Sequence, residues 1–173
     1  MKHSIFFLLL LCVFSSCSRK SEADLYREGK AAEEQKNFPL AVERYEEVVK
    51  QAPKTAYAET SQYHVAVIYN NDLQDWVKAV AAYRVFYMMF PSSSHAPSAL
   101  FLTGFLFNNQ LHQIDSARMA YEMFLRQYPT HELATSAKFE LETLGKDPGQ
   151  IVQSQQLSSA DSVKPQQHKK AAK

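Results

Sequence analysis

Glycine and cysteine are scarce in this chain of 173 residues. The four glycines, Gly29, Gly104, Gly145 and Gly149, lie far apart, so the chain has no glycine-rich loop of the Walker or Rossmann kind to hold a phosphate. Nucleotide-dependent enzymes of those classes are therefore excluded. The formal net charge is only +1, without the basic excess that binding to a phosphate backbone requires. We therefore expect no nucleic-acid partner.

Long hydrophobic runs are also missing. The apolar run Ile5 to Phe14 has ten residues, whereas a transmembrane helix needs about 20. Lys2 precedes this run and the small residues Ser15 and Ser16 follow it, which is typical of a signal peptide that is removed from the mature protein. We therefore assign residues 1–16 to a signal peptide.

The signal peptide is followed directly by Cys17. The segment Phe14-Ser15-Ser16-Cys17 resembles the bacterial lipobox, which implies that the Cys17 thiol is acylated and that Cys17 becomes the mature N-terminus. Cys12 fits less well because Leu11 before it is not small. The alternative is an ordinary secretory signal that leaves Cys17 as a free thiol. In either case processing leaves one cysteine, so we expect no intramolecular disulfide and a fold stabilised by its core alone.

Three segments of the chain recur at a spacing of 38 residues. Each contains an alanine, a tyrosine four residues later and a proline eight residues after that. The apolar residues within each segment follow helical spacing, which predicts an amphipathic helix that ends near the proline. A second apolar helix is predicted before each one, over Glu22–Gln35, Ala56–Asn70 and Ala96–Asn108, with a small residue at the same close-packing position. The residues assigned to packing within the repeats are Gly29, Ala41, Tyr45, Pro53, Ala66, Ala79, Tyr83, Pro91, Gly104, Ala117, Tyr121 and Pro129.

This pattern resembles the tetratricopeptide repeat, with 38 residues where about 34 is typical. The segment Pro91 to Leu100 is similar to the inter-repeat segment of two groups of envelope lipoproteins. One is the BamD or YfiO type, which acts in outer membrane protein assembly, and the other is the YbgF type, which is associated with Tol-Pal. The resemblance implies an all-α superhelix of three helix-turn-helix repeats with a C-terminal capping helix. Thr130 is the expected N-cap of that last helix and Gly145 its C-terminal stop.

The chain is thus expected to have four parts. They are a signal peptide (1–16), a lipidated N-terminus with a short tether (17–21), a tetratricopeptide-repeat domain (22–145) and a disordered tail (146–173). Within the domain, the repeats are expected at about 22–53, 56–91 and 96–129, and the cap at 130–144.

The first helices of tetratricopeptide repeats line a concave groove, and this resemblance implies a partner-binding site here. The repeat spacing places an aromatic row, a mixed row and a polar row on this face. Aromatic side chains supply contact area and amides bind the backbone of a peptide, which suits an extended or helical segment of a partner. The alternative is that tight winding of the superhelix buries the aromatic rows in the core. The residues in these three rows are Tyr26, Tyr63 and Phe101, then Lys30, Val67 and Phe105, then Glu33, Asn70 and Asn108.

No catalytic or metal site is predicted. His64, His95, His112 and His131 occur singly, without the second histidine or cysteine that zinc requires. We expect each of these histidines to lie on the surface or in an interface. No serine lies in a nucleophile elbow between glycines. We therefore expect no enzyme activity, no cofactor and no small-molecule substrate; an enzyme would need a deep pocket with convergent titratable groups.

The tail is rich in Gln, Ser and Lys, and from Lys146 onward it has five lysines against two aspartates. This composition predicts disorder, and the basic residues could bind peptidoglycan or anionic lipid. The residue after Cys17 is Ser18 rather than Asp, which by resemblance favours sorting to the outer membrane. The sequence therefore predicts a lipid-anchored scaffold on the periplasmic face of the outer membrane that binds proteins, the β-barrel assembly machinery among them. The alternative function is that of an accessory to cell-wall or polysaccharide machinery, as in Tol-Pal-like envelope maintenance.

Overall fold

The computed structural model describes residues 19–146 of the chain. The signal peptide, Cys17 and all of the tail after Lys146 lie outside the described residues. Within the described range the chain forms helices and no strands. They are α1 (Glu22–Glu34), α2 (Phe38–Gln51), α3 (Ala56–Asn71), α4 (Trp76–Met89), α5 (Ala96–Asn109), α6 (Ile114–Gln127) and α7 (Ala134–Thr143).

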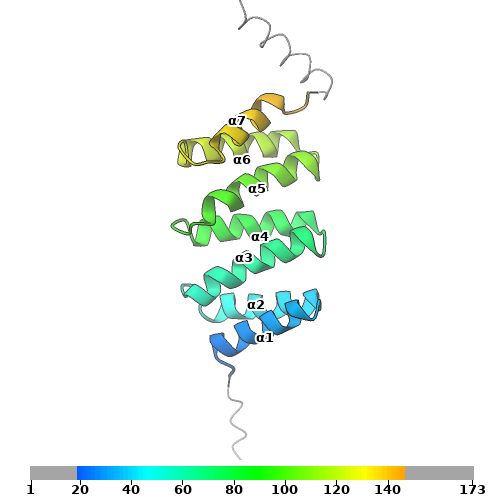
Figure 1. Cartoon of the computed structure of the whole chain (residues 1–173), viewed down its shortest axis with the longest axis vertical. Helices are drawn as coiled ribbons and strands as arrows, with labels where there is room; N and C mark the ends of the chain where they lie inside the picture. Colours follow the sequence, from blue (N-terminus) through cyan, green and yellow to red (C-terminus); the bar gives the residue numbers. More distant parts are fainter. Residues whose placement is uncertain (1–18, 147–173) are drawn as a thin grey trace, which may run out of the picture.

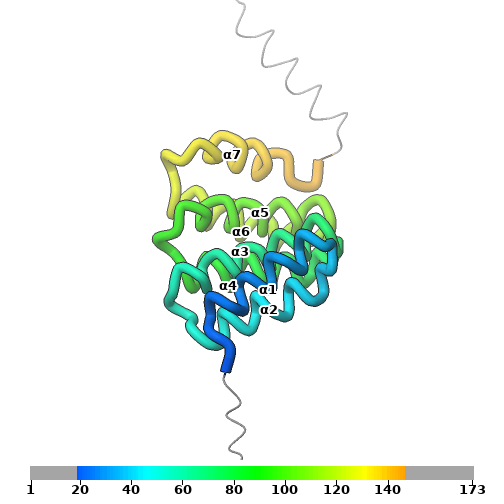
Figure 2. Tube along the Cα trace, turned by 60° about the horizontal axis from the view of Figure 1, so that its bottom comes forward, coloured from blue at the N-terminus to red at the C-terminus, as the bar shows by residue number. Residues whose placement is uncertain are grey.

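The helices form an elongated stack in chain order. Each helix packs against the one before it and the one after it, with α1 at one end and α7 at the other (Figure 1). In the tilted view α7 forms the upper end of the stack and the helices of each repeat overlap one another (Figure 2). The helices pair as α1 with α2, α3 with α4 and α5 with α6. The predicted all-α superhelix of three helix-turn-helix repeats with a capping helix is confirmed.

Each repeat is held together by a tyrosine of its second helix. Tyr45, Tyr83 and Tyr121 are at most 1% exposed, and each packs beneath the first helix of its own repeat. A Cβ atom added to Gly29 would lie 2.8 Å from the Tyr45 ring, and one added to Gly104 would lie 2.9 Å from the Tyr121 ring. Both distances are shorter than normal contacts, so the ring occupies the space that glycine leaves open.

The turn inside each repeat places one non-glycine residue in the left-handed region. Lys36, Gln74 and His112 have φ angles of 58°, 50° and 52°, and they are 38 residues apart. The residue after each of them is the N-cap of the second helix. Asn37 and Asp75 accept a hydrogen bond from the backbone N–H three residues on, at 3.4 and 3.2 Å. This hydrogen bond to Lys78, together with the Lys78 side chain, lowers the pKa of the Asp75 carboxyl.

The capping helix begins later than the sequence predicted. Thr130 is not its N-cap, because α7 starts at Ala134 and its N-cap side chain makes no hydrogen bond. Residues 128–134 instead form a turn with the same backbone hydrogen bonds as the turn 90–96 between α4 and α5. Thr130 occupies the place of Ser92 in that repeated turn. At the other end, Gly145 adopts a φ of 74° just after the helix, as expected of a C-terminal stop.

Gln113 gives a direct test of the repeated N-cap. Its backbone (φ −100°, ψ 78°) matches that of Asp75 (φ −89°, ψ 80°), yet its side chain makes no capping hydrogen bond. We expect Gln113→Asp to raise the free energy of unfolding by about 1 kcal/mol, because the shorter carboxylate can accept from the N–H of Ser116. Urea unfolding of Gln113→Asp beside Gln113→Ala measures this; equal midpoints for the two variants would contradict the capping role.

Candidate functional site

The nine residues that the sequence assigned to partner binding lie on α1, α3 and α5. We call the surface that they form the first-helix face. Its three rows differ in how far their side chains reach solvent, and they are described in turn.

The aromatic row of the first-helix face is half-buried. Tyr26, Tyr63 and Phe101 each pack against a buried aromatic ring of the second helix of their own repeat, with centroid distances of 5.8, 5.1 and 5.6 Å. Part of this row is covered by Tyr57, near the start of α3, and by His95, just before α5. Tyr57 lies 5.2 Å from Tyr26, and His95 stacks on Tyr63 at 4.5 Å. The side chains of this row are therefore partly packed in the core and partly exposed. This result lies between the two alternatives that the sequence left open, which are an exposed groove and a buried core.

The mixed row is the most accessible of the three. Lys30 is exposed, Phe105 keeps 37% of its surface in solvent and Val67 is half-buried. An exposed aromatic ring on a rigid helix supplies contact area at low entropic cost to a partner. The mixed row is therefore the part of the first-helix face that is most accessible to another molecule.

The polar row links neighbouring repeats. The Tyr45 hydroxyl donates a hydrogen bond of 2.7 Å to Glu33, and Nδ1 of His64, in the next repeat, lies 3.0 Å from the same carboxylate. The His64 ring also stacks on Tyr45, with a centroid distance of 5.1 Å. Glu33 thus joins two side chains from two different repeats.

The same arrangement recurs where repeat three meets the capping helix. Glu140 of α7 accepts hydrogen bonds from the Asn108 side chain at 3.3 Å and from the Tyr121 hydroxyl at 3.4 Å. Glu140 lies two repeat lengths after His64. No role was predicted for Glu140 from the sequence, and His64 was expected to be a single surface or interface histidine. The repeat spacing was the signal that could have shown that they occupy equivalent positions. We call the residues at this position in successive units the column.

The middle repeat breaks the column. Leu102 stands in it between His64 and Glu140, and Asn70 bonds to its neighbour Asn71 at 2.8 Å. Asn70 also acts on the Tyr83 hydroxyl, where it partly offsets the rise in pKa that burial causes. The polar row is thus fixed at both ends of the stack and less constrained at its centre.

The core tyrosines remain hydrogen-bond donors over the whole physiological range. Burial raises the pKa of Tyr45 and of Tyr121 far above the ordinary value, and the adjacent carboxylates Glu33 and Glu140 raise each further. A phenolate beside a carboxylate would place two like charges together in a half-buried site. The hydroxyl groups therefore stay protonated and hold the carboxylates.

Replacing Tyr45 by Phe tests the link between repeats one and two. We expect Tyr45→Phe to lower the free energy of unfolding by about 1–2 kcal/mol, because a hydrogen bond to a charged group is lost. Tyr83→Phe is the matched control, since its partner is a neutral amide, and it should cost about half as much. Urea unfolding of both variants measures the difference. A Tyr83→Phe variant that is as unstable as Tyr45→Phe would argue that the carboxylate adds nothing.

The described part of the chain offers no ligand set for a metal: residues 19–146 contain no group of three or more His, Cys, Asp or Glu side chains placed to bind one. In the same range no helix combines the length and the apolar character that crossing a membrane requires.

Comparisons with known proteins agree with this architecture. The tetratricopeptide-repeat domain of Arabidopsis OM64 shares 18% sequence identity and superposes with a TM-score of 0.51, over 70% of this chain and 94% of that domain. This likeness shows the fold. No curated protein sequence matches the chain. The profile of the YfiO family, described as an outer membrane lipoprotein, matches residues 18–147, which confirms the predicted resemblance. The chain belongs to the YfiO family of outer membrane lipoproteins.

Proposed function

We propose that this protein is a lipid-anchored scaffold that binds other proteins through its first-helix face during the assembly of outer membrane proteins. Family membership supports the site of action, and the repeat fold supports binding rather than chemistry. The observation that carries the proposal is the accessible mixed row, in which Phe105 keeps 37% of its surface exposed on a rigid helix.

The stack presents the mixed row with little freedom of movement. The aromatic row beneath it is fixed by ring contacts, and the polar row beside it is fixed by Glu33 and Glu140. A preorganised surface binds without first losing conformational entropy. Lys30 at one end and Phe105 at the other give the face a charged and an aromatic end, which would orient an extended or helical segment of a partner.

The membrane anchor is part of the proposal. Cys17 follows two small serines after the apolar run, and the family consists of outer membrane lipoproteins. Several acyl chains on one cysteine would hold the protein on the membrane effectively permanently. The repeat domain would then stand on the periplasmic face, close to proteins that enter the outer membrane.

Replacing Cys17 tests the anchor. We expect Cys17→Ala to leave the repeat domain folded and to release the protein from membranes, because the acylated thiol is lost. Membrane flotation of cell lysates measures the distribution, and Cys12→Ala is the matched control, which should stay with the membranes. Retention of Cys17→Ala in the membrane fraction would contradict lipidation at this residue.

The mixed row is tested with Phe105→Ser. We expect this variant to lose about 5–30-fold in the recovery of β-barrel assembly proteins after crosslinking in cells of the native host, as removal of a contact worth 1–2 kcal/mol would cause. Leu73→Ser is the matched control, since Leu73 is equally exposed at 37% but lies in the turn between α3 and α4. Equal recovery with both variants would move the binding site off the first-helix face.

A role in cell-wall maintenance is the alternative. It rests on the lysines of the tail, of which only Lys146 lies within the described residues. Removing residues 150–173 and measuring co-sedimentation with peptidoglycan separates it from the assembly role, which does not require the tail.

A further inference from the structure

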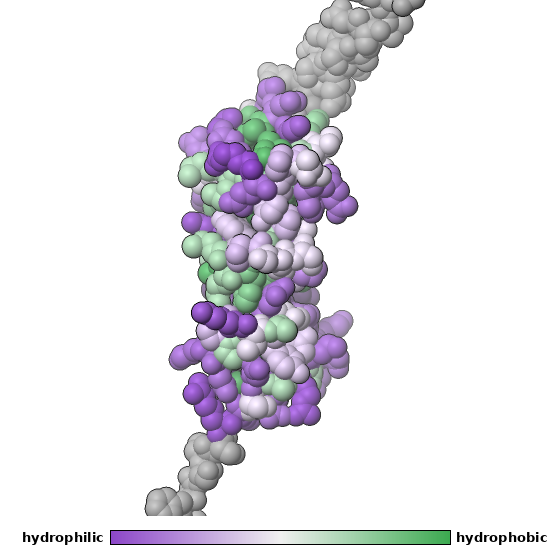
Figure 3. Space-filling model, turned by 90° about the vertical axis from the view of Figure 1, so that its left-hand side faces the viewer, coloured by the Kyte–Doolittle hydropathy of each residue, from purple (hydrophilic) through white to green (hydrophobic). Residues whose placement is uncertain are grey.

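The outward face of α4 is more apolar than that of α2. The 38-residue spacing gives each outward position of α4 a counterpart on α2. Val77 and Met88 are 66% and 69% exposed, and Ala81 and Val85 lie exposed between them. The side of the molecule on which α4 ends shows hydrophobic surface at mid-height of the stack (Figure 3). The counterparts on α2 are Pro39, Glu43, Glu47 and Lys50.

This comparison separates packing from function. The charged residues of α2 show that the stack folds without apolar side chains at these positions. The four apolar residues Val77, Ala81, Val85 and Met88, which we call the stripe, therefore add nothing to the helical frame. They expose apolar surface to water, and its burial would be favourable by about 25 cal/mol per Å². A stripe of this kind is expected where another molecule covers it.

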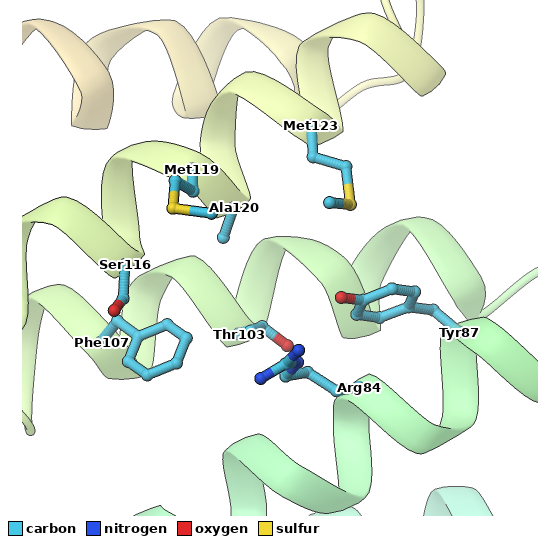
Figure 4. A pocket seen from close by; sticks show the side chains of 8 residues that line it. All are labelled: Arg84, Tyr87, Thr103, Phe107, Ser116, Met119, Ala120 and Met123. Atoms are coloured by element: carbon cyan, nitrogen blue, oxygen red, sulfur yellow. The ribbon is translucent and has the colours of Figure 1, made fainter.

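The stripe lies between two hollows. Its residues Ala81 and Val85 line the hollow between α2 and α4, while Arg84 and Tyr87 of the same helix line a hollow of about 130 Å³ between α4 and α6. Figure 4 shows the two helices on opposite sides of it, with α5 between them. Methionine side chains adapt their shape to a partner, which suits them to a docking surface. Its lining includes Arg84 and Tyr87 of α4, Thr103 and Phe107 of α5, and Met119 and Met123 of α6.

The hollow carries a positive charge that the described residues do not balance. Arg84 is exposed, and no carboxylate in the range 19–146 lies within ion-pair distance of it. The counterparts of Arg84 are Glu46 on α2 and Glu122 on α6, so the charge is reversed only here. The Thr103 hydroxyl already donates to the Ala99 carbonyl at 2.9 Å. Arg84 is therefore the cation of this hollow that is available to pair with a carboxylate.

A second hollow, between α2 and α4, works as an internal comparison. It is lined by equivalent positions, but Glu46 stands where Arg84 stands in the first hollow. In the second hollow Glu46 lies with Lys78, which pairs with Asp75 at 3.0 Å. A ligand with a carboxylate among apolar groups would therefore prefer Arg84 of the α4–α6 hollow, which is unpaired within residues 19–146.

We propose that the α4–α6 surface docks an amphipathic helix of another protein whose apolar face carries one Asp or Glu residue that pairs with Arg84. Two neighbouring helices with a hollow between them offer a groove that the side chains of a third helix can enter. The carboxylate would form a charge-assisted hydrogen bond with the guanidinium of Arg84. The protein would then hold two partners, one on each face.

A second copy of the chain fits this surface poorly. Arg84 lies near the middle of the stripe between Val77 and Met88, so a two-fold contact of α4 with α4 would bring two arginines together. A lipid surface would meet the exposed tips of the stripe, but a flat membrane would leave the hollow between α4 and α6 unfilled.

The experiment uses model helices as probes and the mature chain with Cys17→Ala as the receptor. The probes are 20-residue peptides with leucines at helical spacing and a single Glu in the middle of the apolar face, and the same peptide with Lys in its place. Fluorescence anisotropy should show at least tenfold tighter binding of the Glu peptide. Arg84→Glu should reverse that preference.

A folding-neutral variant keeps the test decisive. Val85→Glu with Met88→Lys copies Glu47 and Lys50 of α2 onto α4, so the frame is known to accept both residues. We expect unchanged helicity by circular dichroism and at least tenfold weaker binding of the Glu peptide. Phe105→Ser should bind the peptide normally, which separates this surface from the first-helix face.

Three results would overturn the proposal. The first is equal binding of the Glu and Lys peptides, or no binding of either. The second is binding of phosphatidylglycerol vesicles that the Val85→Glu and Met88→Lys changes abolish, which would assign the stripe to lipid. The third is a dimer in analytical ultracentrifugation that the same changes dissociate, which would assign it to self-association.

Discussion

The contact between a buried tyrosine and a small residue of the preceding helix sets the geometry of the whole stack. Gly29 and Gly104 let the rings of Tyr45 and Tyr121 reach the backbone of the first helix, closer than a Cβ atom would allow. The tyrosines recur every 38 residues, and the three first helices carry the small residues Gly29, Ala66 and Gly104 at the matching position. Both faces of the protein, with the rows that they carry, inherit their regularity from this contact.

The tyrosine hydroxyl extends this contact from packing to linkage between repeats. Its ring fills the core. At the first boundary its oxygen reaches Glu33, which also contacts His64 of the next repeat, and at the last boundary it reaches Glu140 of the capping helix. A stack of three repeats has only a few such boundaries, so each has a large effect on cohesion. The polar contacts of Glu33 and Glu140 lie at the two ends of the stack, where helices have the fewest neighbours. At the centre the same column holds the apolar residue Leu102.

The fold could be predicted from the sequence because packing that repeats along the chain requires the same residue types at a regular spacing. The alanine, tyrosine and proline positions predicted the second helices, and the small residues predicted where the first helices approach. The start of the capping helix could not be predicted in the same way. Thr130 is a favourable N-cap by residue type, but the turn between Pro129 and Ala134 is fixed by backbone hydrogen bonds that depend on the chain direction after α6. Local preference was overridden by the repeated turn.

The candidate site was predicted less completely, for a related reason. Register alone placed the nine residues on one face, but it could not tell how deeply each side chain lies. That depth depends on residues from neighbouring units, such as Tyr57 over Tyr26 and His95 over Tyr63. The role of Glu140 could not be predicted from its own segment, because its partners Asn108 and Tyr121 lie on two other helices.

The repeat frame itself separates structure from function in this protein. A residue type that recurs at one position in all three units is explained by packing, since every unit has the same packing to satisfy. A residue type that departs from the frame without a packing reason calls for a different cause. The arginine on the outward side of α4, where its counterparts on α2 and α6 are glutamates, is such a departure, and so is the exposed Phe105 where α1 has Lys30. One departure lies on each face, so the two proposed docking surfaces are held by one repeat frame on opposite sides of the stack.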